Sequence, residues 1–263
     1  RPIQELKMRP ETLIAAVLRG RKVIIRTLDL GTDKQASYFR PEKENNPAMG
    51  YRAIRISLAQ PELFKTQLRA LHRASVYGNL DILLPLITSV DEVRSTKMII
   101  NEVTAELDAE NIEYRDDLRL GIMIETPAAV MISDKLAKEV DFFSIGTNDL
   151  TGYTMAADRG NNNVSYLYSA FQPSVLRMIK QIIEAGRKKH IPVGMCGEAA
   201  SDPMMIPLLI SFGLTEFSVS APNVLRVRKA ISLWTKEKAD KVAEKVMTLH
   251  TLQEVIAYLK TKV

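Results

Sequence analysis

The segment DFFSIGTNDLTGYTMAADR, residues 141–159, places side chains capable of ligand and metal chemistry directly after an apolar run. The run at 142–145 has the length and residue types of a fully buried strand, and a glycine ends it. Asn148 and Asp149 follow at once, in the position where parallel α/β barrels hold their catalytic groups. A carboxylate there suits a hard divalent cation, an amide suits a ligand oxygen, and the guanidinium of Arg159 suits an anion. The same residues also fit a capped strand end in which Asn and Asp serve the next turn.

Four more polar side chains lie at or just beyond the downstream ends of other predicted strands. They are Arg26, Arg52, Glu125 and Cys196. Equivalent strand ends of a barrel meet at one rim, so we expect these side chains to converge with those of Asn148 and Asp149. Glu125 and Asp149 can share a magnesium ion that keeps other coordination positions open for substrate oxygens.

The arginines and the cysteine add two further kinds of chemistry. Guanidinium groups of Arg26, Arg52 and Arg159 can hold phosphate and carboxylate groups through paired donors, and Cys196 can give or accept a proton. Taken singly, each residue has a structural alternative: a small buried cysteine, an arginine in a surface ion pair, or a Glu125 favoured by a helix dipole. Six such residues at equivalent strand ends favour a shared site.

The elements that would position these residues alternate between strands and helices. Predicted strands cover residues 22–30, 51–56, 81–87, 118–125, 142–145, 192–198 and 216–220. Predicted helices cover residues 11–18, 61–74, 89–107 and 173–189, with further helices after 126, after 201 and at the C-terminal end. Residues 31–50 form a long polar loop without periodicity. The alternation predicts a parallel sheet with helices outside, and seven strands are one short of a closed eight-stranded barrel.

The amino-acid composition argues against a nucleic-acid-binding protein, a disulfide-bonded protein and a membrane-spanning protein. The chain has 263 residues and a formal net charge of +5, with basic and acidic residues intermingled, so no basic block argues for nucleic acid. Its single cysteine excludes an intramolecular disulfide and fits a reducing cytosol, so we expect a cytoplasmic protein. No apolar run approaches the length of a membrane span. The sequence starts at Arg1 without methionine, so we expect processing or a longer parent chain.

Five runs carry a resemblance to a known family. They are IRTLDLGTDK (25–34), ENNPAMGYRAIR (44–55), GIMIETPAA (121–129), FFSIGTNDLTGYTMAADR (142–159) and GMCGEAASD (194–202). They resemble the phosphoenolpyruvate-binding domain of enzyme I, the phosphoenolpyruvate–protein phosphotransferase at the head of the bacterial sugar phosphotransferase system. The similarity spans about residues 22–233. It implies a (β/α)8 TIM-type barrel of the phosphoenolpyruvate/pyruvate superfamily, with its first strand missing or replaced, and a homodimer.

The resemblance also implies roles for the candidate residues. Arg26, Arg52 and Arg159 would hold phosphoenolpyruvate with help from Asn148 and Asp149. Glu125 and Asp149 would bind Mg2+, and Cys196 would protonate the enolate of pyruvate. The phosphoryl group would pass to a histidine of a separate domain. A carrier protein would then accept the phosphoryl group from that histidine.

Two departures from the family qualify this expectation. The family's first strand, an arginine followed by Thr-Glu-Phe, has no counterpart in residues 1–10. The phosphohistidine domain and the carrier-binding helices have no counterpart either, and His72, His190 and His250 lack the Gly- and Thr-rich surroundings of the family's phosphorylated histidine. We therefore expect one barrel domain over 1–263, with a poorly matched segment at 1–22 and C-terminal helices at 235–263, as a fragment or truncated relative of a longer enzyme.

Three other functions stay open at this point. A pyruvate phosphate dikinase or phosphoenolpyruvate synthase shares the barrel motifs, although GYRAIR favours the sugar-system enzyme. A metal-dependent aldolase or lyase acting on a pyruvate enolate also uses paired carboxylates, but the arginines disfavour it because such an enzyme has no phosphoryl group to hold. A non-catalytic module that senses phosphoenolpyruvate or dimerises is supported by the missing first strand.

Overall fold

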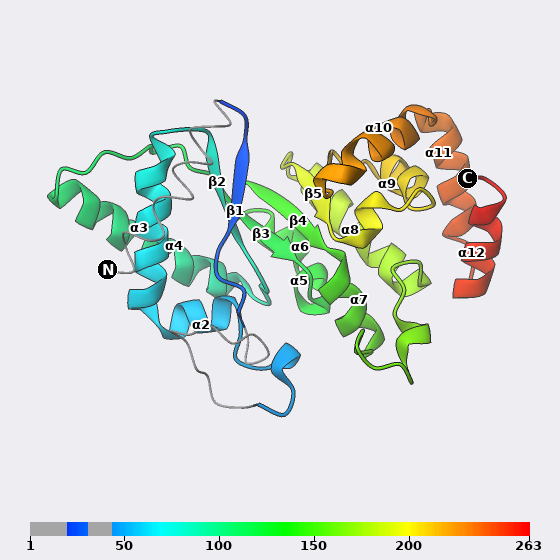
Figure 1. The fold of residues 1–263 in the computed structure, drawn as a ribbon, viewed down its shortest axis with the longest axis horizontal. Helices are drawn as coiled ribbons and strands as arrows, with labels where there is room; N and C mark the ends of the chain where they lie inside the picture. The colour runs from blue at the N-terminus through cyan, green and yellow to red at the C-terminus, as the bar shows by residue number, and fades with distance from the viewer. Residues whose placement is uncertain (1–19, 31–43) are drawn as a thin grey trace. The chain divides into compact units, whose positions relative to one another are not determined.

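The computed structural model describes residues 20–30 and 44–263 (Figure 1). The predicted helix at 11–18 and most of the predicted loop at 31–50 lie outside the described residues. The chain forms two compact units, Arg1–Ile122 and Met123–Val263.

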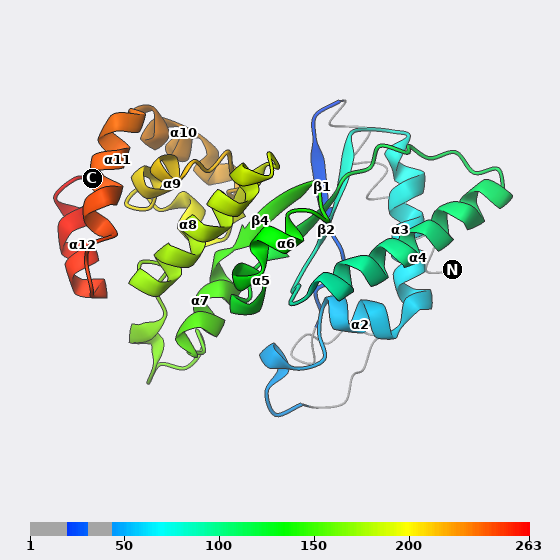
Figure 2. The same cartoon turned by 180° about the vertical axis from the view of Figure 1, so that it is seen from behind.

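The first unit contains parallel strands covered by helices. β1 (Val23–Arg26) pairs with β2 (Leu80–Leu84), which pairs with β3 (Leu120–Ile124), a strand that runs across the unit boundary. The helices are α2 (Ile54–Ala59), α3 (Pro61–Ser75) and α4 (Val90–Ala109), with a 3-10 turn, η1, at Pro47–Met49. All three helices lie on one side of β1 and β2 (Figures 1 and 2).

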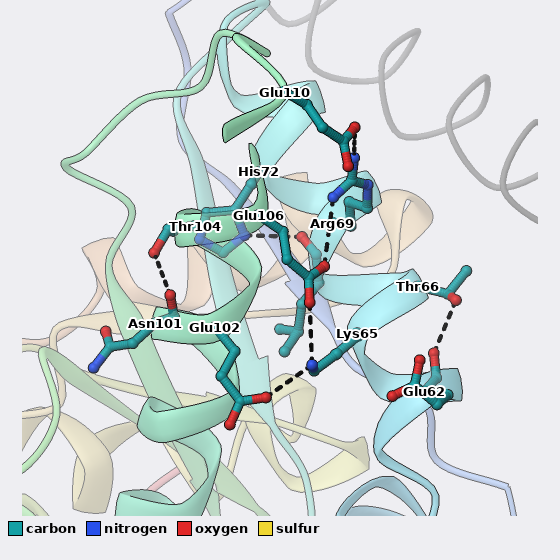
Figure 3. Close-up of polar contacts among 11 residues, drawn as sticks. Glu62, Lys65, Thr66, Arg69, His72, Asn101, Glu102, Thr104, Glu106 and Glu110 are labelled. Atoms are coloured by element: carbon teal, nitrogen blue, oxygen red, sulfur yellow. Dashed lines mark hydrogen bonds and ion pairs between the residues drawn. The ribbon is translucent and has the colours of Figure 1, made fainter. Parts of the chain in front are cut away.

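Ion pairs join α3 to α4 along their exposed edges (Figure 3). Lys65 Nζ lies 2.8 Å from Glu102 Oε2 and 3.1 Å from Glu106 Oε1, and Arg69 pairs with Glu106 and Glu110. The hydrogen bonds to Glu102 and then Glu106 raise the pKa of Lys65. Isolated exposed ion pairs contribute little to the free energy of unfolding, whereas pairs joined in a network, as here, can contribute more.

His72 lies on the buried face of α3. Its Nδ1 is 2.8 Å from the Leu68 carbonyl oxygen, and its ring meets Tyr114 edge-on at 5.8 Å. Burial lowers the pKa of His72, against a smaller opposing effect of the Leu68 hydrogen bond. These contacts fit a structural role for this histidine.

The second unit again has parallel strands with helices around them. Its strands are β4 (Phe142–Gly146), β5 (Val193–Cys196) and β6 (Glu216–Phe217). Its helices are α5 (Pro127–Met131), α6 (Ser133–Leu136), α7 (Thr147–Met155), α8 (Pro173–Lys188), α9 (Ile206–Phe212), α10 (Val224–Ser232), α11 (Lys236–Val246) and α12 (Leu252–Lys260). Three 3-10 turns connect them: η2 (Ser165–Leu167), η3 (Glu198–Ser201) and η4 (Ala221–Asn223). The helix α8 packs on β4 and β5, and its position beside β4 is visible in Figure 2. Its buried residues include Leu176, Ile179, Ile182 and Ile183.

The described residues confirm an α/β fold with parallel strands and most of the predicted elements. Six of the seven predicted strands are present, and the capping boxes at Ser89 and Thr251 form as the sequence indicates. Thr126 also caps α5, accepting a hydrogen bond from the amide of Ala129 at 3.2 Å. In the described part of the chain no helix is long and apolar enough to span a membrane.

The predicted strand at 51–56 is wrong, because helix α2 begins at Ile54. Ala53, just before it, has a φ of 52°, and its amide donates to the Leu30 carbonyl at 3.1 Å. This long-range bond and the left-handed backbone turn the chain into a helix where the alternation of Ile54 and Ile56 predicts a strand.

Candidate active site

Polar residues that the sequence singles out lie at or just after the ends of three strands. Glu125 follows β3, Asn148 and Asp149 open α7 directly after β4, and Cys196 ends β5. Gly146 is the register partner of Cys196, so β4 and β5 end level with each other. These groups therefore lie at or just after the carboxyl ends of parallel strands.

Glu125 fills the space beside Gly146. The glutamate is 3% exposed, and a Cβ added to Gly146 would lie 2.8 Å from the Cβ of Glu125 and closer still to its Oε2. The buried carboxylate of Glu125 thus lies against Gly146, the last residue of β4. Asp149, in the first turn of α7, follows Gly146 by three positions. Carboxylate oxygens are ligands that hard divalent cations take from proteins.

The thiol of Cys196 is held against the end of β4. Its Sγ donates to the Ile145 carbonyl oxygen at 3.5 Å and accepts from Ser144 Oγ at 3.8 Å. Thr147 Oγ1 donates to the Cys196 carbonyl oxygen at 3.1 Å. Gly197 has a φ of 97°, and a Cβ there would collide with Thr147 Oγ1, so only glycine fits this turn.

Arg159, in the segment after α7, pairs with a residue just beyond β5. Arg159 Nη1 lies 3.6 Å from Glu198 Oε1, and both side chains are largely exposed. Tyr168 donates through its hydroxyl to the Asn148 carbonyl oxygen at 2.7 Å. Burial raises the pKa of Tyr168, the charge of Arg159 opposes this, and the charges of Asp149 and Glu198 add to it, so all three charged groups act on the phenol.

Two arginines meet in the first unit. Asp29, with a side chain 8% exposed, accepts from Arg52 Nη2 at 2.9 Å through one oxygen and pairs with Arg26 Nη1 at 3.1 Å through the other. Arg52 is 13% exposed and Arg26 44%. Arg52 lies in the turn before α2 and not at a strand end, because the predicted strand is replaced by that helix.

The predicted site residues therefore form two sets, one in each unit. Arg26 and Arg52 share Asp29 in the first unit. The second unit holds Glu125, Asn148, Asp149, Arg159 and Cys196. Sequence reasoning missed the contacts of Asp29, Ser144 and Tyr168. The three-residue spacing of Arg26 and Asp29 is a signal for the first, whereas the other two depend on strand register and loop path.

Comparison with known proteins decides the family. The model of the phosphoenolpyruvate-binding domain of phosphoenolpyruvate-utilising enzymes matches residues 4–235. The chain belongs to this family. The match begins well before residue 22, where the motif resemblance starts.

Curated relatives share about half of their residues with this chain over most of its length. The phosphoenolpyruvate-protein phosphotransferase of Bacillus subtilis strain 168 is 49% identical over 243 residues, 92% of this chain and 43% of the relative. That of Listeria monocytogenes is 48% identical over 255 residues, 97% of this chain and 45% of the relative. The chain thus spans less than half the length of these relatives.

A solved structure shares the fold. The crystal structure of a citrate lyase from Burkholderia xenovorans LB400 aligns with a TM-score of 0.52 at 15% identity, covering 96% of this chain and 76% of that one. At this identity the likeness concerns the fold alone.

Proposed function

We propose that this chain binds phosphoenolpyruvate together with Mg2+ and supplies its phosphoryl group to a histidine of a separate domain, releasing pyruvate. The observation that carries the proposal is the placement of Glu125, Asp149 and Cys196 at or just after strand ends, with Glu125 beside Gly146 and Gly146 in register with Cys196, in a member of the phosphoenolpyruvate-binding family. The curated relatives named phosphoenolpyruvate-protein phosphotransferase support the reaction over its alternatives.

The residues divide the work by charge and position. Glu125 and Asp149 would hold Mg2+, which supplies positive charge for the phosphoryl oxygens when bound. Arg26, Arg52 and Arg159 would bind the phosphoryl and carboxylate groups through paired guanidinium donors, and Asn148 would orient the substrate. Cys196 would then give its proton to the methylene carbon of the pyruvate enolate.

The proposal extends to the whole assembly. The fold would be a (β/α)8 TIM-type barrel formed by one domain over 1–263, with the phosphohistidine domain and the carrier protein as partners. The chain would act as a homodimer in the cytoplasm. Sedimentation that finds only monomers at high concentration with magnesium and phosphoenolpyruvate would contradict the proposed homodimer.

Calorimetric titration with phosphoenolpyruvate, with and without magnesium, tests the binding step. We expect binding that depends on magnesium and that is lost in Asp149→Asn and in Arg52→Ala. Asp134→Asn is the matched control, because Asp134 is exposed and pairs with its sequence neighbour Lys135 at 3.0 Å. A folded wild-type chain without magnesium-dependent binding, or an Asp149→Asn variant that binds like wild type, contradicts the proposal.

The transfer step needs its own readout. Pyruvate release is measured after adding a separately purified phosphohistidine domain of the phosphotransferase type. We expect release only with magnesium and with the histidine of that domain intact. Release that continues when this histidine is replaced contradicts histidine as the acceptor.

A further inference from the structure

Ser144 and Cys196 lie diagonally opposite each other on one face of the β4–β5 pair. Ser144 pairs in register with Gly194, and Gly146 pairs with Cys196. Alternate residues of a strand share a face, so these four residues point to the same side. Because the two glycines have no side chain, the diagonal between the serine hydroxyl and the thiol is open, and Ser144 Oγ donates to Cys196 Sγ at 3.8 Å.

The sulfur is therefore held at two points. It accepts from the Ser144 hydroxyl and donates its own proton to the Ile145 carbonyl oxygen at 3.5 Å. The neighbouring hydroxyl of Thr147 does neither, because it donates to the backbone carbonyl of Cys196 at 3.1 Å. Of these two hydroxyls, that of Ser144 is the one in contact with the sulfur.

We propose that Ser144 is a positioning residue that holds the Cys196 sulfur and stabilises the thiolate left when the thiol gives up its proton. The proposal rests on the proposed function, in which the S–H bond of Cys196 breaks and a C–H bond forms at the enolate methylene carbon. The electron pair of the S–H bond stays on sulfur, and the enolate supplies the pair for the new bond. A hydrogen bond to the charged form favours that form, so the Ser144 hydroxyl lowers the free energy of the product thiolate.

The charged groups near Cys196 stay the same in the Ser144 variants that test this role. Glu125 lies beside Gly146, Glu216 packs its Cβ 3.4 Å from where a Cβ of Gly194 would lie, and Arg159 pairs with Glu198. All of these remain when Ser144 alone is changed. A difference between the variants therefore reports the hydroxyl.

Alkylation of the thiol by iodoacetamide, followed by mass spectrometry of the full chain, measures the effect without any substrate. Cys196 is the only cysteine, so every added group reports this sulfur. We expect Ser144→Ala to slow alkylation at pH 7 by about three- to tenfold, as loss of one hydrogen bond implies. The rates should converge at a pH high enough to ionise the thiol fully, and Ser144→Thr, which keeps the hydroxyl, should alkylate like wild type.

Ser201→Ala is the matched control, because its hydroxyl donates to the Glu198 carbonyl at 2.9 Å, five residues from Cys196. Thermal melting verifies that each variant is folded. Unchanged alkylation of Ser144→Ala at pH 7, a deficit that persists at high pH, or an equal deficit in Ser201→Ala overturns the proposal. Slowed alkylation in a chain that fails to bind phosphoenolpyruvate refutes the proposed function and leaves the Ser144–Cys196 contact standing.

Discussion

Replacing Gly146 by alanine tests whether the buried Glu125 occupies the space that the structure assigns to it. The new Cβ would lie 2.8 Å from the Cβ of Glu125, nearer still to its Oε2, and 3.1 Å from Met123 Sδ. The carboxylate end of Glu125 can turn away, but its Cβ is fixed by the backbone after β3. The clash therefore moves either the end of β3 or the start of α7, where Asp149 lies.

The size of the effect follows from the packing. Adding a methyl group to a filled interior costs about 1–3 kcal/mol in free energy of unfolding. The φ of Gly146 is −90°, which alanine adopts freely, so backbone strain adds nothing to this cost. We expect a fall in Tm of several degrees and a loss of magnesium-dependent phosphoenolpyruvate binding of tenfold or more, because Glu125 is displaced.

Gly152→Ala is the matched control on α7. Its Cβ would lie 3.4 Å from the Ala157 carbonyl oxygen and 3.5 Å from Tyr168 Cε2, which are ordinary contacts. Alanine also favours the helix interior over glycine by about 0.5–1 kcal/mol, so this variant should be at least as stable as wild type. Thermal unfolding and calorimetric titration compare the two. A Gly146→Ala chain with wild-type Tm and wild-type binding would refute the packing of Glu125 against Gly146.

Three further predictions concern single side chains. Asp29→Asn keeps the shape but removes the charge shared by Arg26 and Arg52, and should lower the free energy of unfolding in urea by about 1–2 kcal/mol; no change would mean that the pairs are not formed in solution. Ala156→Gly should raise the free energy of unfolding by about 0.5–1 kcal/mol, because Ala156 ends α7 at φ 50° and ψ 39°, where glycine is favoured. Destabilisation would contradict the left-handed backbone conformation at this residue. Burial lowers the pKa of His72, so below about pH 6.5 the unfolded chain binds a proton that the folded chain resists. Stability should therefore fall between pH 7 and pH 5.5, by at most about 1.4 kcal/mol per pH unit for this group, and less steeply in His72→Gln; equal slopes would contradict the burial of a neutral ring.

Local sequence signals predict most of the elements because their causes are local. Buried parallel strands read as continuous apolar runs, which is why 142–145 and 118–125 are found at nearly their observed bounds. Helix starts are equally local, since the capping boxes at Ser89 and Thr251 need only residues three apart.

Arg52 shows where local reasoning fails. The alternation of Ile54 and Ile56 has the period of a strand, yet both are buried on one short helix. The deciding interactions are the amide of Ala53 bonded to Leu30 and the carboxylate of Asp29 bonded to Arg52, which join segments more than twenty residues apart. The sequence nominates Arg52 as a candidate site residue, but it does not predict the element that carries Arg52.

The register between β4 and β5 determines which of the candidate side chains lie on the same face of the sheet. With Gly146 opposite Cys196, Ser144 and the thiol share a face, and Glu125 lies over the glycine. A shift of one residue in this register would put Ser144 and Cys196 on opposite faces of the sheet and break the hydrogen bond between them. The two glycines at 146 and 194 are therefore as necessary to the site as its charged residues, because they provide the space in which a carboxylate and a thiol can lie against two paired strands.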